Sequence, residues 1–134
     1  MSAWADGILA RVLPLAVSVY ETGRQRDMDP AAGQRPVLHV AEAVGIACAA
    51  HGIYLPLTDT ALAAVAARDG APAAAPWGRG AIVVLADGRV GLTAGRGAVI
   101  ESAGESLAII RTPEPGRYVA AWQIPGAQYW KAEP

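Results

Sequence analysis

Apolar residues recur every three or four positions between residues 4 and 20, as expected for one face of an amphipathic helix. Pro14 lies within this stretch and is expected to kink the helix. Residues 23–36 are rich in Gly, Pro, Asp and Arg and have no apolar period. This composition predicts a surface loop after the first helix.

A second helix is predicted at residues 38–50, where the sequence is apolar nearly all round. A helix with that pattern belongs in the middle of a core. Thr58 or Asp59 can cap a third helix, and Gly70 is a suitable stop for it. The first half of the chain is therefore expected to supply three helices, the middle one buried.

The pattern changes after a Pro- and Ala-rich linker at residues 71–79. Short runs of β-branched residues now alternate with turn signals such as Asp87-Gly88, which predicts an antiparallel strand meander. Helices followed by antiparallel strands indicate an α+β fold with a roughly five-stranded antiparallel sheet. The five strands are expected at residues 81–86, 89–94, 98–102, 106–112 and 117–124.

The length of 134 residues and the hydrophobic content of 53% are sufficient for one core and one domain. Residues 1–134 are accordingly expected to form a single domain. Its parts are an N-terminal helix and loop (1–36), the central and third helices (37–70), the linker (71–79), the strand meander (80–126) and a tail (127–134).

Charge and hydropathy exclude several classes of partner. Eleven basic and twelve acidic residues give a formal net charge of −1, which argues against nucleic acid and anionic membranes as partners. No apolar run approaches the roughly 18 residues of a membrane span. The first twenty residues lack a basic segment and a cleavage context, so we expect synthesis in the cytoplasm without a signal peptide.

Cys48 is the only cysteine, so neither an intrachain disulfide nor a thiolate zinc site can form. Asp27, Asp29 and Glu42 lack the ordered spacing of a calcium loop. We therefore expect no metal and no cofactor.

Cys48 and His51 are three residues apart on the predicted central helix and are able to face one another there. A thiol–imidazole pair is one interpretation of this spacing. The mid-helix position between two alanines favours the other interpretation, in which Cys48 packs as a small hydrophobe and His51 caps the helix.

Four segments, taken in order, resemble the NlpC-type papain-like cell-wall peptidases. GIYLPLT at residues 52–58 resembles the family's "GI-x-LP-x-T" segment after its central helix, and GAIVVL at 80–85 resembles its first strand. RVGLTAGRGAVIESA at 89–103 is similar, without a gap, to the family's "HVGIYLGNGRMIHA"-like hairpin. VAAWQIPG at 119–126 resembles its last strand. The resemblance implies a small papain-like fold over roughly residues 37–126.

The same resemblance implies that the catalytic groups are gone. The family's nucleophilic cysteine stands at the start of the central helix, and that position falls on Val40. Its general-base histidine falls on Arg89, and the polar residue that orients the histidine falls on Glu101. Because valine has nothing to ionise and arginine stays protonated, the resemblance implies a pseudoenzyme.

Further residues are expected to line the substrate cleft that the resemblance implies, or to contact partners. His39, Thr93 and Ser102 are the candidate groove residues. Arg89 and Glu101 are expected on the outer ends of neighbouring strands, either as a cross-strand ion pair or as two solvated charges. Aromatic and loop residues are the candidate partner contacts, because loops and large aromatics carry recognition: Arg24, Arg26, Trp77, Tyr129 and Trp130.

Three functions are consistent with these features. The first is a structural or assembly protein, because NlpC-type domains also occur in phage tails and gene-transfer particles. The second is a module that binds peptidoglycan without cutting it. The third is an atypical cell-wall hydrolase that uses a residue outside the family's set, although no constellation of residues indicates one.

Overall fold

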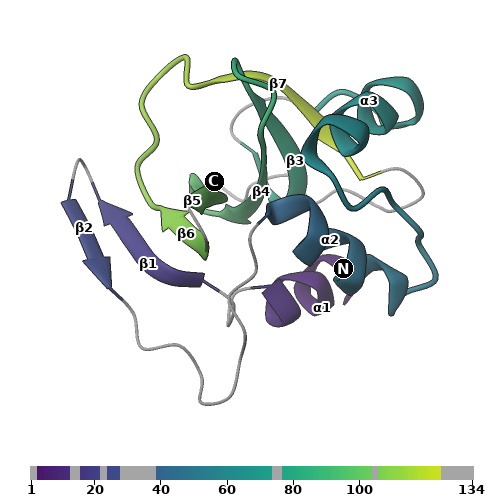
Figure 1. Ribbon diagram of the computed structural model, residues 1–134, viewed down its shortest axis with the longest axis horizontal. Coiled ribbons are helices and arrows are strands. Elements are labelled where there is room, and N and C mark those ends of the chain that lie inside the picture. Colours follow the sequence, from purple (N-terminus) through teal and green to yellow (C-terminus); the bar gives the residue numbers. More distant parts are fainter. Residues whose placement is uncertain are drawn as a thin grey trace.

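The structure is a computed structural model that describes residues 3–12, 16–21, 24–27, 39–73, 77–103 and 106–124. Within these ranges the chain forms three helices and a seven-stranded sheet (Figure 1). The elements are α1 (Ala3–Val12), β1 (Ala16–Glu21), β2 (Arg24–Asp27), α2 (Val40–Ala49), α3 (Asp59–Asp69), β3 (Arg79–Leu85), β4 (Val90–Gly95), β5 (Ala98–Ala103), β6 (Ser106–Ile110) and β7 (Tyr118–Gln123).

The strand order in the sheet is β2-β1-β6-β5-β4-β3-β7. Strands β3 to β7 pair antiparallel with one another, and each of the five lies where the sequence predicted a strand. The predicted α+β class, with helices ahead of an antiparallel meander, is confirmed. In the β4–β5 hairpin Gly91 lies opposite Glu101, and the turn uses positive φ at Gly95, Arg96 and Gly97.

The N-terminal region differs from the prediction. The first helix ends at Val12, and residues 16–21 form β1, which pairs parallel with β6. Pro14 cannot continue the hydrogen-bond ladder of a helix, and the Val-Ser-Val-Tyr sequence that follows favours a strand. The predicted loop at residues 23–36 contains β2, an edge strand, and its remainder from residue 28 lies outside the described residues.

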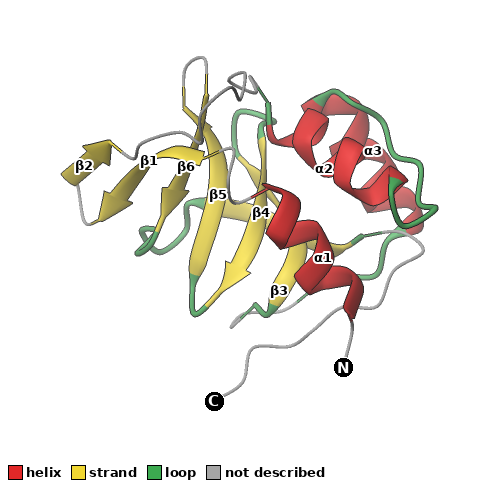
Figure 2. Ribbon diagram, turned by 90° about the horizontal axis from the view of Figure 1, so that it is seen from below, coloured by secondary structure: helices red, strands yellow, loops and turns green. Residues whose placement is uncertain are grey.

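The predicted central and third helices are confirmed as α2 and α3. They pack with α1 against strands β3, β4, β5 and β7, so the helices gather at that end of the sheet (Figure 2). The shared core joins Val44 and Leu62 from the helices to Ile82, Leu92 and Ile100 from the strands. Alternate strand residues such as Val83 and Val99 are fully buried on the other face of the sheet.

The start of the predicted linker pairs with the sheet. Pro72 forms a bridge with Trp122, and the amide of Gln123 donates to the carbonyl of Ala71. The amide of Ala73 donates to the carbonyl of Ala121. This short segment therefore covers part of the outer edge of β7.

None of the helices in the described part of the chain has the length and apolar character that a membrane crossing requires.

Candidate functional site at the start of the central helix

The first turn of α2 is held by side chains from distant elements. His39, the N-cap residue, is exposed, has extended backbone angles and makes no side-chain capping bond. The amide of Val40 instead donates to the Oγ of Ser102 on β5, at 3.0 Å. Both residues are buried. A hydroxyl from the sheet thus takes up an amide that a helix start leaves unpaired.

Asp59 is the second group at this helix start. Its Oδ1 accepts a hydrogen bond from the amide of Ala41, and its Oδ2 accepts one from the amide of Val90, both at 3.3 Å. Asp59 opens α3, where the N-cap is Thr58, without a side-chain bond. One carboxylate therefore ties α3 to α2 and to the first residue of β4, at the positive end of the α2 dipole.

Arg89 lies just before β4, beside the same helix start. Its Nη1 donates to the carbonyl of Ser102 at 3.2 Å, and its Nε donates to the Oδ2 of Asp87 at 2.8 Å. The backbone amide of Arg89 and then its guanidinium lower the pKa of Asp87. Val40 and Arg89 therefore both contact Ser102, so two of the three positions that the family resemblance singles out lie together.

Glu101 lies apart from this group. Its carboxylate accepts from the Nε and Nη2 of Arg117, at 2.8 and 2.7 Å, and from the hydroxyl of Tyr118. Because successive strand residues point to opposite faces, Glu101 and Ser102 face opposite sides of the sheet. Both alternatives for Arg89 and Glu101 are therefore wrong: Arg89 is paired with Asp87, and Glu101 is buried and paired with Arg117 instead of being solvated. Ser102 is the residue of β5 that reaches Val40.

Glu101, Arg117 and Tyr118, called here the Glu101 network, are joined by hydrogen bonds around a buried carboxylate. Glu101 is 2% exposed. Burial, followed by the hydrogen bond to Glu101, raises the pKa of the Tyr118 hydroxyl, and the bond to Glu101 raises the pKa of Arg117. The ring of Trp77 meets that of Tyr118 edge to face at 5.6 Å. The raised pKa values keep Arg117 positively charged and the Tyr118 hydroxyl protonated, so both remain donors to Glu101 and the network acts as a structural cross-link.

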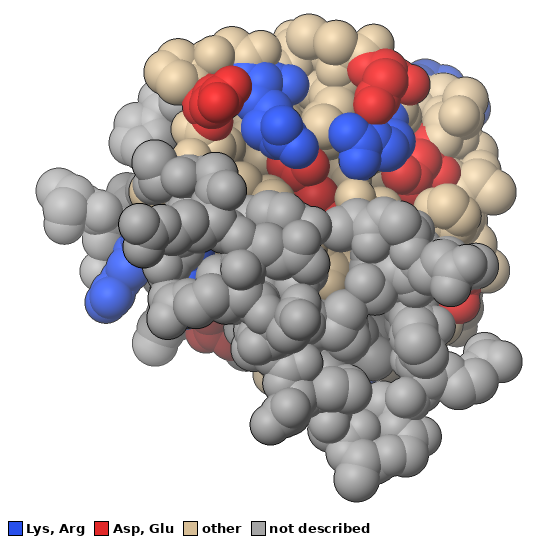
Figure 3. All heavy atoms as spheres, turned by 60° about the vertical axis from the view of Figure 1, so that its left-hand side comes forward, with Lys and Arg blue, Asp and Glu red and all other residues tan. Residues whose placement is uncertain are grey.

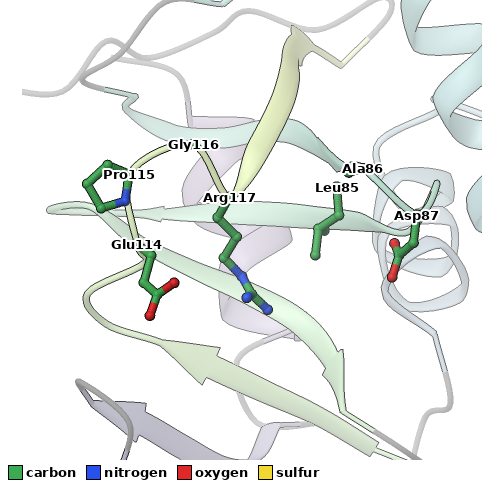
Figure 4. A pocket seen from close by; sticks show the side chains of 7 residues that line it. All are labelled: Leu85, Ala86, Asp87, Glu114, Pro115, Gly116 and Arg117. Atoms are coloured by element: carbon green, nitrogen blue, oxygen red, sulfur yellow. The ribbon is translucent and has the colours of Figure 1, made fainter.

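A shallow hollow of about 360 Å³ opens beside Arg117 (Figure 4). It lies between the turn after β3 and the turn before β7, and Asp87 and Glu114 stand on opposite sides of it. Acidic and basic side chains lie side by side over the described part of one face of the molecule (Figure 3). This mixed surface fits the net charge of −1.

Cys48 lies near the other end of α2 and is fully buried. Burial raises the pKa of its thiol from the ordinary 9.0 to about 12. His51 is exposed beyond the helix end, and its backbone amide donates to the Cys48 carbonyl. A thiol in this position stays protonated at neutral pH, which supports the packing interpretation over the catalytic one.

The remaining predicted site residues have different settings. Thr93 is buried on the same face of the sheet as Glu101. Its Oγ1 accepts a hydrogen bond from the amide of Ala81 at 2.8 Å, so it supports the sheet. The Nε1 of Trp77 is buried and makes no hydrogen bond with the described residues. Arg24 and Arg26 lie on β2, and their side chains are not described. Tyr129 and Trp130 lie outside the described residues.

In the part of the chain that the structure describes, no group of three or more His, Cys, Asp or Glu residues is arranged to hold a metal ion. Comparison of the sequence with protein-family models and with curated proteins, and of the fold with solved structures, finds no match. Function therefore has to be inferred from the residues themselves.

Two functional contacts were missed from the sequence. Thr58 or Asp59 is expected from the sequence to cap the third helix; Thr58 is its N-cap residue, and the Asp59 carboxylate instead accepts hydrogen bonds from the amides of Ala41 on α2 and Val90 on β4. Arg117 was placed on a strand with no partner, and it binds Glu101 sixteen residues away. Neither pairing has a local sequence signal, because each depends on how the strands and helices pack.

Proposed function

We propose that this chain is a catalytically inactive, papain-like domain of the NlpC type, which serves as a structural component of a protein assembly such as a phage-type tail or particle. Val40 carries the proposal. At the position that the resemblance assigns to the nucleophile, the side chain is apolar and fully buried, and its amide is already bonded to Ser102.

The proposal is further supported by the chemistry around Ser102. Arg89, at the position of the family's general base, is paired with Asp87, and a guanidinium group has no site that accepts a proton. It contacts Ser102 through the backbone carbonyl, so it does not activate the hydroxyl. The Ser102 Oγ in turn accepts a hydrogen bond from the amide of Val40. A nucleophile needs an adjacent base within hydrogen-bond reach, and neither contact supplies one.

An assembly role is consistent with how the former cleft is used. Ser102, Asp59 and Arg89 join α2, α3, β4 and β5 through hydrogen bonds where an active enzyme would admit a substrate. Such bonds make the helix start rigid. We propose that the fold now acts as a scaffold whose surface, rather than its cleft, carries the function.

The test is affinity capture of the tagged full chain from its host lysate, with quantitative mass spectrometry, run beside co-sedimentation with purified peptidoglycan. Enrichment of a fixed-ratio set of tail or particle proteins is expected. The double variant Arg24→Ala/Arg26→Ala tests the partner contacts predicted for that segment and should reduce the enrichment.

Retention on peptidoglycan without such proteins would overturn the assembly role in favour of a wall-binding module that does not cut. The hollow between Asp87 and Glu114 is the surface feature that favours this second candidate. Release of peptidoglycan fragments would overturn both.

A further inference from the structure

Arg117 has hydrogen-bonding capacity that the Glu101 network does not use. A guanidinium group carries five N–H donors in a planar fork. The Nε and Nη2 of Arg117 each donate to Glu101, whereas its Nη1 makes no hydrogen bond with the described residues. The side chain is 34% exposed and lines the hollow between the turn after β3 and the turn before β7. One edge of the guanidinium is therefore open to an acceptor that enters the hollow.

Glu114 supplies a carboxylate to the same hollow. Its side chain is exposed, and the carboxylate has no hydrogen bond or ion pair with a described residue. The amide of Arg117 donates to the carbonyl of Glu114 at 3.2 Å, and Gly116 has the positive φ of 80° that this tight turn requires. The turn therefore holds the two residues close together. Figure 4 shows the carboxylate of Glu114 and the guanidinium of Arg117 extending from the turn on the same side.

The charges around the hollow determine which ligand it suits. Arg117 is already paired with Glu101. Asp87, on the opposite side of the hollow, is paired with Arg89. A simple cation bound to Glu114 would lie beside the guanidinium of Arg117, and a simple anion bound to Arg117 would lie beside the carboxylate of Glu114. Like charges at such short range repel. A ligand that carries both an ammonium and a carboxylate group avoids both conflicts.

We infer that the hollow is a binding site for a small zwitterion, namely a free α-amino acid. Its carboxylate accepts hydrogen bonds from the open edge of Arg117, and its ammonium group donates to Glu114. The volume of about 360 Å³ lies at the lower end of the range for ligand pockets, about 300–1,000 Å³, and so suits a small molecule. Leu85 and Pro115 line the hollow and offer apolar contacts to an aliphatic side chain. The site does not depend on the proposed function, since it needs neither a papain-like ancestry nor an assembly.

Binding at this site is weak and reversible. The hollow is shallow, and solvent and salt screen the contact between an exposed carboxylate and an ammonium group. The dissociation constant is therefore expected in the millimolar range. Chemical-shift titration measures affinities of this order, and alanine is a suitable probe because it adds only a methyl group to the two charges.

Titration of the ¹⁵N-labelled full chain with alanine tests the site. The amide of Gly116, which lines the hollow, should shift and reach saturation. The amide of Gly70 should not move, because Gly70 packs against the carbonyl of Gln123 at the other end of β7. Alaninamide keeps only the ammonium group and N-acetylalanine keeps only the carboxylate. Each should bind about fivefold more weakly than alanine, or worse, since one charged contact is then lost.

Glu114→Gln tests the ammonium contact without disturbing the Glu101 network, and it should raise the dissociation constant for alanine about fivefold or more. Asp69→Asn is the matched control: Asp69 is an exposed carboxylate next to Gly70, far along β7 from the hollow, and the constant should not change. A Gly116 shift that never saturates with alanine would overturn the site. Alaninamide or N-acetylalanine that binds as tightly as alanine would also overturn it, as would equal losses in Glu114→Gln and Asp69→Asn.

Discussion

At the start of α2, Ser102 does the work that a local capping residue does in most helices. It reaches the Val40 amide across 62 residues of sequence, whereas His39, at the N-cap itself, makes no capping bond. The backbone at Val40, the position that the resemblance assigns to the nucleophile, is therefore stabilised by β5.

Ser102→Ala should lower the free energy of unfolding by about 0.5–2 kcal/mol, the usual range for a lost cap, because the buried Val40 amide then has no partner. Urea denaturation measures the loss. Thr58→Ala is the matched control: Thr58 is the N-cap of α3 and makes no side-chain bond, so little change is expected. Equal losses in both variants would show that the Ser102 contact is not a cap.

Glu101→Gln keeps the shape of the side chain and removes its charge, which leaves Arg117 without its counter-ion. We expect a loss of about 1–3 kcal/mol in unfolding free energy, reduced by the partial exposure of Arg117. The exposed pair Arg68–Asp69 is the comparison, and Arg68→Ala should leave the denaturation midpoint unchanged. A Glu101→Gln protein as stable as wild type would rule out a structural role for the network.

Cys48 gives a prediction with a definite pH range. Its pKa is raised from 9.0 to about 12, so folding favours the protonated thiol. The stability that this contributes is fully present below the unfolded pKa and is lost as the pH rises from about 9 toward 12. Stability should therefore fall across that range, and less so in Cys48→Ala.

The native Cys48 thiol should also react with a disulfide reagent at pH 8 far more slowly than it does in denaturant. Rapid labelling of the folded chain would contradict its buried position and reopen a catalytic role.

At the scale of the elements, the strongest sequence patterns predicted the structure best. The five meander strands and helices α2 and α3 follow from apolar periodicity and from turn residues such as Asp87-Gly88. The predicted N-terminal helix extends too far because Val19 and Tyr20 fit a helical period as well as they fit a strand. Only the pairing of β1 with β6, 90 residues away in sequence by the register of Val19 with Ile109, decides between the two.

The candidate site at the start of α2 was also predictable only in part. The order of motifs led to Val40, Arg89 and β5 as neighbours. Whether Glu101 or Ser102 is the β5 residue that contacts the start of α2 depends on which face of the sheet each side chain occupies. A register shift of one residue exchanges the two faces. The roles of Asp59 and Arg117 depend on tertiary packing alone.

The hairpin of β4 and β5 requires a glycine at its centre. A Cβ on Gly91 would lie 2.7 Å from the Cγ1 of Val99 and 3.0 Å from the Cγ2 of Val83. Gly91→Ala should therefore cost about 1–3 kcal/mol through overpacking, as measured by thermal or urea unfolding. Gly7→Ala is the control, because an added Cβ there meets only the ring of the exposed His51, which is able to move. A Gly91→Ala chain that unfolds like Gly7→Ala would contradict the packing of this face.

At the scale of the molecule, the chain is a small α+β domain in which Ser102, Asp59 and Arg89 tie the start of α2 to α3, β4 and β5. Arg89 is paired there with Asp87, and the large apolar side chains that are exposed in the described residues lie elsewhere, on α2, on the loop after it and at Val119 on β7. This distribution favours a protein that acts through its outer surface.

We propose that this chain binds and assembles without catalysing a reaction. The most direct test is incubation of purified peptidoglycan with stoichiometric full-length protein, followed by mass spectrometry of the soluble fraction. No released fragment is expected, for the wild type and for Ser102→Ala alike. Fragments that the wild type releases and Ser102→Ala does not would contradict it and would identify Ser102 as a nucleophile.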